Sequence, residues 1–304
     1  MAAAAEVEPP AIGDVATRRE RIVPLFRLIA DLRGPVAGVG VARHTLTTAD
    51  GAQLDLTWYS LADAPGSAVL YLHGGGMIHG LGQTQPGYDA IVRSYVAASG
   101  VPMLMVDYRV APEHPDPTPV EDCYAALCWL AENAAGLGVD PARLAVAGDS
   151  AGGGLAAGVS LLARDRGGPA LALQLLIYPM LDDRTTTPDP QLAPELLTWN
   201  YNDNITGWGA LLGDAAGSDD TVSVYAAPAR ARDLTGLPPT YLDVGDLDIF
   251  RDEDIAYAAR LSAAGVPTEL HVYPGCPHAF EALAPSAGVS RRVIADRVRR
   301  LKAI

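Results

Sequence analysis

Hydrophobic and polar positions follow a regular order along most of the chain, in which short apolar runs alternate with amphipathic stretches. The apolar runs lie at 68–73, 101–106, 144–147, 173–178, 240–244 and 270–273, and the amphipathic stretches lie at 91–98, 120–132, 155–164, 255–263 and 290–302. Short, continuously apolar strands that alternate with helices are typical of a parallel sheet covered by helices on both faces. The pattern therefore predicts an α/β fold with a mostly parallel central sheet.

The N-terminal region has a different pattern. An amphipathic stretch at 18–32 predicts a helix, which a glycine and a proline at 34–35 would end. Two strand-like runs follow at 41–48 and 54–61, and an Asp-Gly pair lies between them. This pair is a strong signal for a hairpin turn, so the first two strands should be antiparallel.

A second departure lies at 182–233, where threonine, proline and glycine interrupt the alternation. A departure of this length inside a compact domain is more typical of an insertion with a function than of a plain loop. We expect 182–233 to form a helical cap over one end of the sheet. The N-terminal segment 1–45 should contribute to this cap, and residues 46–304 should form the main domain.

The composition narrows the classes of partner. The chain holds 36 acidic and 22 basic residues, for a net charge of -14, and an acidic surface repels phosphate backbones. The N-terminus lacks the basic start of a secretory signal, and no stretch approaches the roughly 18 apolar residues of a membrane span. Three cysteines are too few for a disulfide framework. We therefore expect a cytoplasmic protein without nucleic-acid or membrane partners.

The strongest chemical motif is GDSAGG at 148–153, directly between a predicted strand and a predicted helix. This is the context of a nucleophile elbow, a tight turn that presents a serine hydroxyl at the N-terminus of a helix. The small residues Gly148 and Gly152 are what such a turn requires, because a side chain there would clash with a neighbouring element. Ser150 is therefore the candidate nucleophile.

A second motif, HGGG at 73–76, follows the first buried strand. When a serine attacks an ester carbonyl, it produces an oxyanion that backbone N–H groups can stabilise. Glycines allow the backbone to approach the substrate without a β-carbon in the way. The expected donors are the amides of Gly74, Gly75 and Gly76, together with the amide of Ala151 directly after the nucleophile.

The general base should be a histidine on a loop after a late strand, and among six histidines only His278 has this position. The acid that orients it should follow the preceding strand. Asp243 lies inside that strand, and Asp252 lies at the start of the next helix. Position alone leaves two candidates for the acid, Asp246 and Asp248.

Taken together, these motifs resemble the hormone-sensitive-lipase-like branch of α/β-hydrolase esterases, the bacterial family IV lipolytic enzymes. The matching pieces are HGGG at 73, DYRVAPEHP at 107, GDSAGG at 148, YP at 178, DLDIFRDE at 246 and HAF at 278. They occur in the order of the family and cover roughly residues 65 to 285. The proline segment at 114–119 lacks the aromatic residue usual in the family, which concerns the packing of a loop.

The resemblance implies an α/β-hydrolase fold for 46–304 and selects Asp248 as the acid, because the family places it before a hydrophobic pair and an Arg-Asp-Glu sequence. The implied site comprises Ser150, Asp248 and His278, in the chain order of α/β-hydrolases. The implied activity is hydrolysis of small carboxylic esters through an acyl-enzyme, with no cofactor and no metal. The expected partner is a small-molecule ester, and a homodimer stays open.

Two alternatives remain. A related acyltransferase or amidase would share the same site, and a non-catalytic ligand-binding protein on this fold would need a lost site residue. We expect short acyl chains, because residues 182–233 carry many acidic residues and only short apolar clusters, which would not enter lipid. Trp199, Tyr201 and Trp208 in this segment would either line an acyl pocket or form the core of the cap. Asp149 and Arg109 should hold loops in place.

Overall fold

The computed structural model describes residues 9–62, 66–218 and 221–304. Within these ranges eight strands form one sheet, in the spatial order β1-β2-β4-β3-β5-β6-β7-β8. The strands are β1 (Gly40–Thr47), β2 (Gln53–Ser60), β3 (Ala68–Leu72), β4 (Met103–Val106), β5 (Leu144–Asp149), β6 (Leu173–Ile177), β7 (Thr240–Gly245) and β8 (Thr268–Tyr273). β2 pairs antiparallel with β1 and β4, and the other neighbours are parallel, which confirms the predicted mostly parallel sheet.

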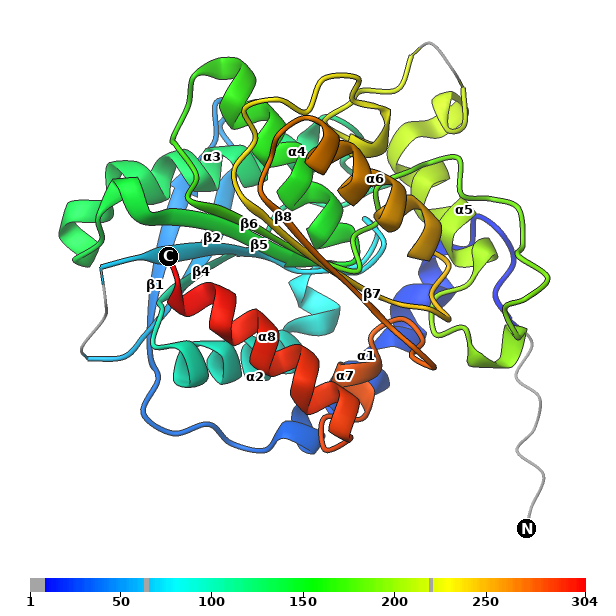
Figure 1. Ribbon diagram of the computed structural model, residues 1–304, viewed down its shortest axis with the longest axis horizontal. Coiled ribbons are helices and arrows are strands. Elements are labelled where there is room, and N and C mark those ends of the chain that lie inside the picture. The colour runs from blue at the N-terminus through cyan, green and yellow to red at the C-terminus, as the bar shows by residue number, and fades with distance from the viewer. Residues whose placement is uncertain (1–8, 63–65, 219–220) are drawn as a thin grey trace.

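Helices cover both faces of the sheet (Figure 1). The α-helices are α1 (Val15–Arg33), α2 (Leu81–Ser99), α3 (Thr118–Glu132), α4 (Ala151–Arg166), α5 (Tyr201–Leu212), α6 (Arg251–Ala263), α7 (Phe280–Leu283) and α8 (Gly288–Lys302). Short 3₁₀-helices are η1 (Ala134–Leu137), η2 (Pro141–Arg143), η3 (Pro194–Leu196), η4 (Gly213–Ala215) and η5 (Pro228–Arg230). Figure 1 shows α3, α4 and α6 on one face and α2, α7 and α8 on the other. No helix in the described ranges is long and apolar enough to cross a membrane.

The central strands are buried on both faces, as their continuous apolar sequences predict. Side chains of a strand point alternately to the two sides, so neighbouring residues join different clusters. In β3, Leu70 belongs to the cluster packed beneath α3 and α4, whereas Val69 and Tyr71 belong to the cluster that includes residues of α2. The sheet therefore forms a rigid layer between two hydrophobic cores.

Helix α2 begins ten residues before the predicted stretch 91–98. The early start was not predicted because the first turns of the helix contain Gly82, Pro86 and Gly87. These residues weaken a helix on their own. Packing on α1 explains the difference, because a β-carbon at Gly87 would lie 2.5 Å from Cδ1 of Phe26. The helix is therefore stabilised by a close contact between helices that sequence periodicity does not reveal.

The segment 182–233 contains α5, which lies beyond the ends of the central strands (Figure 1). The N-terminal region contacts this helix directly. Nε of Arg18 donates a hydrogen bond of 2.9 Å to Oδ1 of Asp203, and the amide of Gly13 donates one of 3.0 Å to the hydroxyl of Thr206. Two segments far apart in the sequence thus lie side by side at this end of the sheet.

Candidate active site

Ser150 occupies a tight turn between β5 and α4, with φ 56° and ψ -123°. A positive φ is strained for a residue with a β-carbon, and such strain is typical of functional turns. The flanking glycines permit close approach of three elements. A β-carbon at Gly152 would lie 2.1 Å from the carbonyl oxygen of Leu72, and one at Gly148 would lie 2.2 Å from that of Gly152. Neither position can hold a larger residue without moving the backbone.

His278 lies between Ser150 and Asp248 and reaches both. Its Nε2 atom is 3.0 Å from Oγ of Ser150, and its Nδ1 atom is 2.6 Å from Oδ2 of Asp248. A carboxylate only accepts hydrogen bonds, so Nδ1 carries the proton and Nε2 is free to accept the serine hydroxyl. All three residues are buried, with exposed fractions of 6% for Ser150, 7% for His278 and 1% for Asp248. The structure brings together the serine, histidine and acid predicted from the sequence.

The electrostatic surroundings of His278 favour its protonated form. Burial has the largest single effect and lowers the pKa of the imidazole, but the charge and hydrogen bond of Asp248, together with the charges of Asp149 and Glu281, raise the pKa above its usual value. Aromatic rings hold the imidazole in position: Tyr178 and Phe250 contact it edge-on, with centroid distances of 4.6 Å and 5.3 Å. The histidine is therefore fixed in orientation and can hold a transferred proton.

The other acidic candidates have different partners. Asp246 accepts a hydrogen bond of 2.6 Å from the amide of Gly275 and so ties the turn after β7 to the turn after β8. Asp243 lies in β7 and pairs with the fully buried Arg297 at 2.7 Å. Asp252 lies in the first turn of α6 and pairs with Arg251. Of these four aspartates, Asp248 is the one that contacts His278 among the described residues.

Gly74 differs from the expectation for an oxyanion donor. Its amide already donates a hydrogen bond of 2.7 Å to the hydroxyl of Tyr88, so this N–H points away from any substrate. The amides of Gly75, Gly76 and Ala151 have no acceptor within the described chain, as expected at a glycine loop and at the first turn of a helix. The set of candidate donors therefore narrows from four amides to three.

Asp149 joins the elbow to the glycine loop. Its carboxylate accepts hydrogen bonds from the hydroxyls of Tyr88, at 2.7 Å, and Tyr71, at 2.9 Å. Tyr88 in turn accepts the amide of Gly74, so one hydroxyl connects the residue before the nucleophile with the HGGG loop. Burial raises the pKa of Asp149, although both hydroxyls favour its charged form. The expected structural role of Asp149 agrees with these contacts, whereas no sequence signal identified Tyr88.

The aromatic residues of segment 182–233 separate into two groups. Tyr201 and Trp208 are buried and belong to the large hydrophobic cluster. Trp199 is half-buried, and the six-membered ring of its indole lies against the HGGG loop: a β-carbon at Gly76 would be 2.0 Å from its Cη2 atom. Of the three aromatic residues considered from the sequence, only Trp199 contacts the candidate site in this way.

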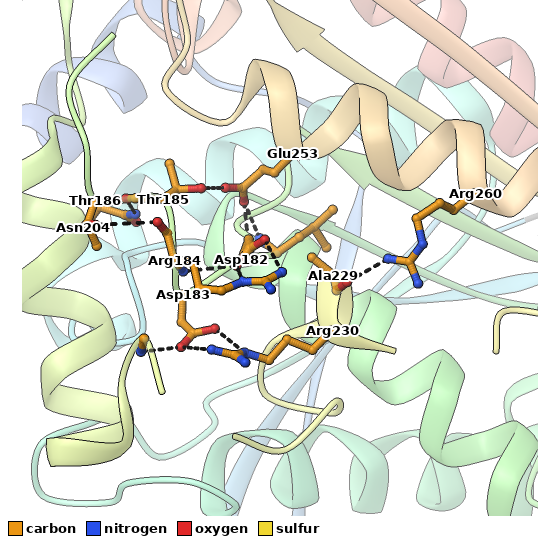
Figure 2. A network of polar contacts seen from close by, with 12 residues as sticks. Asp182, Asp183, Arg184, Thr185, Thr186, Asn204, Ala229, Arg230, Glu253 and Arg260 are labelled. Carbon is orange, nitrogen blue, oxygen red and sulfur yellow. Dashed lines mark hydrogen bonds and ion pairs between the residues drawn. The ribbon is translucent and has the colours of Figure 1, made fainter. Parts of the chain in front are cut away.

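A network of polar contacts holds the start of this segment against α6 (Figure 2). Glu253 of α6 accepts hydrogen bonds from the amides of Leu181 and Asp182, at 2.7 Å and 3.1 Å, and from the hydroxyl of Thr185. Asp183 is fully buried and forms two hydrogen bonds, of 2.6 Å and 2.9 Å, with Arg230. Asp183, one of the acidic residues of the segment, is thus paired inside the protein, which its sequence position alone did not reveal.

The described residues contain no group of three or more histidine, cysteine or acidic side chains arranged to hold a metal ion. His73, the first residue of the HGGG motif, has structural surroundings. His73 is fully buried, stacks on Tyr108 with a centroid distance of 4.2 Å and donates to the carbonyl of Gly74; burial lowers its pKa to about 4. Its neutral ring supports the turn into the glycine loop.

Comparison with known proteins gives consistent matches, of which three follow. A family model described as alpha/beta hydrolase fold matches residues 69–282. The chain is similar to carboxylesterase NlhH of Mycobacterium tuberculosis, with 41% identity over 215 residues, and the alignment covers 70% of this chain but 66% of that relative. It is also similar to esterase LipI of the same species, with 40% identity over 78% of this chain and 73% of the relative.

Among solved structures, a bacterial heroin esterase superposes with a TM-score of 0.87 and 38% sequence identity. The superposition covers 97% of this chain and 93% of that structure. The similarity therefore extends over the sheet, its helices and the segments beyond the strand ends.

Proposed function

Because the chain belongs to the alpha/beta hydrolase fold family, within the hormone-sensitive-lipase-like branch whose motifs it carries, we propose that it is a serine carboxylesterase. Ser150 is the nucleophile, His278 is the general base and Asp248 is the acid that orients the base. The observation that carries this proposal is the position of His278, 3.0 Å from the serine oxygen and 2.6 Å from the aspartate oxygen.

The first half of the reaction forms an acyl-enzyme. Nε2 of His278 takes the hydroxyl proton while Oγ of Ser150 attacks the ester carbonyl carbon. The resulting imidazolium is stabilised by the adjacent Asp248, which stays ionised. The carbonyl oxygen becomes an oxyanion that accepts hydrogen bonds from the amides of Gly75, Gly76 and Ala151. His278 then returns its proton to the alcohol oxygen, and the carbon–oxygen bond to the alcohol breaks.

The second half releases the acid. A water molecule takes the place of the alcohol, and His278 removes its proton as the water attacks the acyl carbon. Collapse of the second tetrahedral intermediate breaks the bond to Ser150, and the serine oxygen regains the proton from His278. The sum of the two halves is an ester and water going to an alcohol and a carboxylic acid. Every proton is moved by side chains of this chain.

We also propose that residues 182–233 and the N-terminal segment together form a cap over the site. The contacts of α1 with α5, through Arg18 and Asp203, support this division of the chain. The approach of α5 to the glycine loop supports it further, because a β-carbon at Gly207 would lie 2.6 Å from the carbonyl oxygen of Gly76. A cap held this closely favours short acyl groups over long lipid chains.

Hydrolysis of p-nitrophenyl esters from acetate to palmitate tests the proposed activity. Each methylene that fits an apolar pocket contributes about 0.8 kcal/mol of burial, so kcat/KM should rise with chain length, reach a maximum near four to six carbons and fall by laurate. A rate that keeps rising to palmitate, or that increases sharply when the substrate exceeds its solubility, would identify a lipase acting at an interface. Absence of hydrolysis for every ester would contradict the proposal itself.

The alternative activities share the site and differ in substrate. Comparing p-nitrophenyl butyrate with the corresponding anilide distinguishes an esterase from an amidase. Adding a short alcohol to the assay distinguishes transfer to an acceptor from transfer to water, since a transferase would form the new ester faster than free acid. A non-catalytic binding protein is disfavoured because serine, histidine and acid all lie within hydrogen-bonding distance.

A further inference from the structure

Trp199 lies directly against one of the candidate oxyanion donors. A β-carbon at Gly76 would be 2.0 Å from Cη2 and 2.5 Å from Cζ2 of the indole, so the ring edge fills the space that a side chain would take. Gly76 has φ 58°, a conformation that also favours glycine. The wall beside this amide is therefore built by the indole of a residue more than a hundred positions later in the chain.

The residue before Trp199 contacts the other side of the site. The hydroxyl of Thr198 donates a hydrogen bond of 2.6 Å to the carbonyl oxygen of His278. Consecutive residues thus contact the loop of the general base and the loop of the oxyanion donors. Thr198 and Trp199 therefore connect the loop that carries His278 with the glycine loop that carries the candidate oxyanion donors.

A buried polar chain fixes the indole in this position. Nε1 of Trp199 donates a hydrogen bond of 3.3 Å to Oδ1 of Asn204, and Nδ2 of Asn204 donates one of 2.8 Å to the carbonyl oxygen of Thr185. The hydroxyl of Thr185 bonds to Glu253, as the close view of Asn204, Thr185 and Glu253 shows (Figure 2). Asn204 is fully buried, so its side-chain amide has a fixed orientation. The indole is therefore held from α6, which begins three residues after Asp248.

The chemistry of the reaction assigns this wall to the acyl side of the substrate. The alcohol oxygen must lie close to Nε2 of His278, because it receives its proton there. The oxyanion points at the amides, and the fourth bond of the tetrahedral carbon goes to Ser150. The acyl chain takes the remaining direction, on the side of the carbonyl carbon opposite the alcohol. The indole beside Gly76 borders one of the amides that would hold the oxyanion, and we assign it to this side of the substrate.

We propose that Trp199 determines the acyl-chain specificity of this enzyme by closing the acyl pocket beside Gly76. This inference rests on the proposed esterase function and deepens it. The substrate class that follows is esters of short carboxylic acids. Removing the indole should lengthen the acceptable acyl chain without affecting the reacting groups.

The experiment compares Trp199→Ala, Trp199→Phe and the control Leu196→Ala, which alters a residue of the same segment that is 46% exposed. For Trp199→Ala, the ratio of kcat/KM for p-nitrophenyl laurate to that for butyrate should rise at least tenfold. Such an increase corresponds to burial of two further methylenes, each of which raises kcat/KM roughly fourfold. Trp199→Phe should give an intermediate ratio, and Leu196→Ala should keep the ratio of the wild type.

A second series keeps the acyl group as butyrate and varies the alcohol from methyl to hexyl. Its profile should stay unchanged in Trp199→Ala. An unchanged acyl profile in a variant that unfolds at the wild-type temperature would overturn the proposal, as would a change confined to the alcohol series. Should Trp199→Ala fold poorly, the ratio in Trp199→Phe gives the same decision. Failure of the esterase function itself would look different, because the wild type would then hydrolyse no member of either series.

Discussion

The hydroxyl of Tyr88 lies 2.7 Å from a carboxylate oxygen of Asp149 and accepts the amide of Gly74 at the same distance. Through this one oxygen atom, helix α2 connects the residue before the nucleophile with the glycine loop that carries the candidate oxyanion donors. The relative positions of Ser150 and the loop therefore depend on a residue that takes no part in the chemistry.

Replacing Tyr88 with phenylalanine should lower kcat about ten- to a hundredfold with little change in KM. Loss of a direct oxyanion donor costs on the order of 10²- to 10³-fold, and loss of a group that positions donors should cost less. The matched control is Tyr71→Phe, which also removes one hydrogen bond to Asp149 but does not reach Gly74. In urea unfolding, Tyr71→Phe should lose about 1–3 kcal/mol, and Tyr88→Phe should lose at least as much because it also leaves the amide of Gly74 unpaired. An equal loss of kcat in the two variants would show that Tyr88 acts only through stability.

Asp248→Asn should reduce kcat/KM far more than Asp246→Asn. An asparagine at 248 would favour the wrong tautomer of His278, which costs on the order of 10⁴-fold in serine proteases. Asp246 instead accepts the amide of Gly275, so its replacement should weaken the loop and cost little activity. Kinetics of both variants on p-nitrophenyl butyrate distinguish them, and the reverse ranking would identify Asp246 as the acid.

The pH profile should have its inflection on the alkaline side of an ordinary histidine. Burial opposes protonation of His278, but Asp248, together with the charges of Asp149 and Glu281, raises the pKa. The base must be neutral to accept the serine proton, so kcat/KM should rise with pH through an inflection above about 6.5 and then stay constant. Asp248→Asn should move that inflection to lower pH. A flat profile from acid to neutral pH would argue against histidine as the base.

The raised pKa of His278 also makes the stability of the folded protein depend on pH, in the direction opposite to activity. A raised pKa means that the folded protein holds the proton on His278 more tightly than the unfolded chain does. Its contribution to stability is therefore complete below the unfolded pKa of about 6.5 and is lost as pH rises through the higher folded pKa. Activity should thus increase over the range in which this contribution decreases. Urea unfolding of wild type and His278→Ala across that range measures the difference.

The buried charges beneath the sheet should dominate the effect of mutations on stability. Arg297 is fully buried and pairs with Asp243 at 2.7 Å and Glu281 at 2.6 Å. Arg297→Met would leave both carboxylates without their cation, which should cost about 3–5 kcal/mol of unfolding free energy. Arg166→Met breaks the exposed pair with Glu121 and should cost less than about 1 kcal/mol. Similar values in urea unfolding would contradict the assignment of Arg297 as a structural charge.

The sequence predicted Ser150 and His278 because each lies just beyond a strand whose apolar sequence is easy to recognise. For the acid, position alone left Asp246 and Asp248 open, and the family resemblance selected Asp248. The three residues lie on the turns that follow β5, β7 and β8, so a parallel sheet brings them to the same edge. The hydrogen-bond partner of the Gly74 amide could not be predicted in the same way. Its amide is taken by Tyr88, and no pattern along the chain indicates that a tyrosine of α2 would reach it.

Helix α5 lies in the segment for which a helical cap was expected, but its bounds were not predicted, for a reason visible in its composition. Its sequence, YNDNITGWGALL, contains two glycines and several residues that favour turns, which gives low intrinsic helix propensity. The helix is held instead by a capping box between Asn200 and Asp203 and by contacts such as Arg18 with Asp203. The position of Trp199 over Gly76 depends on this packing, so it too required the three-dimensional structure.

The proposed role of Ser150 is tested most directly by comparing wild type and Ser150→Ala in p-nitrophenyl acetate hydrolysis, together with the mass of each protein after treatment with a fluorophosphonate. The wild type should hydrolyse the ester and gain one covalent adduct on Ser150. The variant should lose at least about 10⁴-fold in kcat, as expected when a nucleophile is removed, gain no adduct and unfold at the wild-type temperature. A folded variant that keeps more than about a hundredth of wild-type activity would contradict the account, because loss of a nucleophile costs far more.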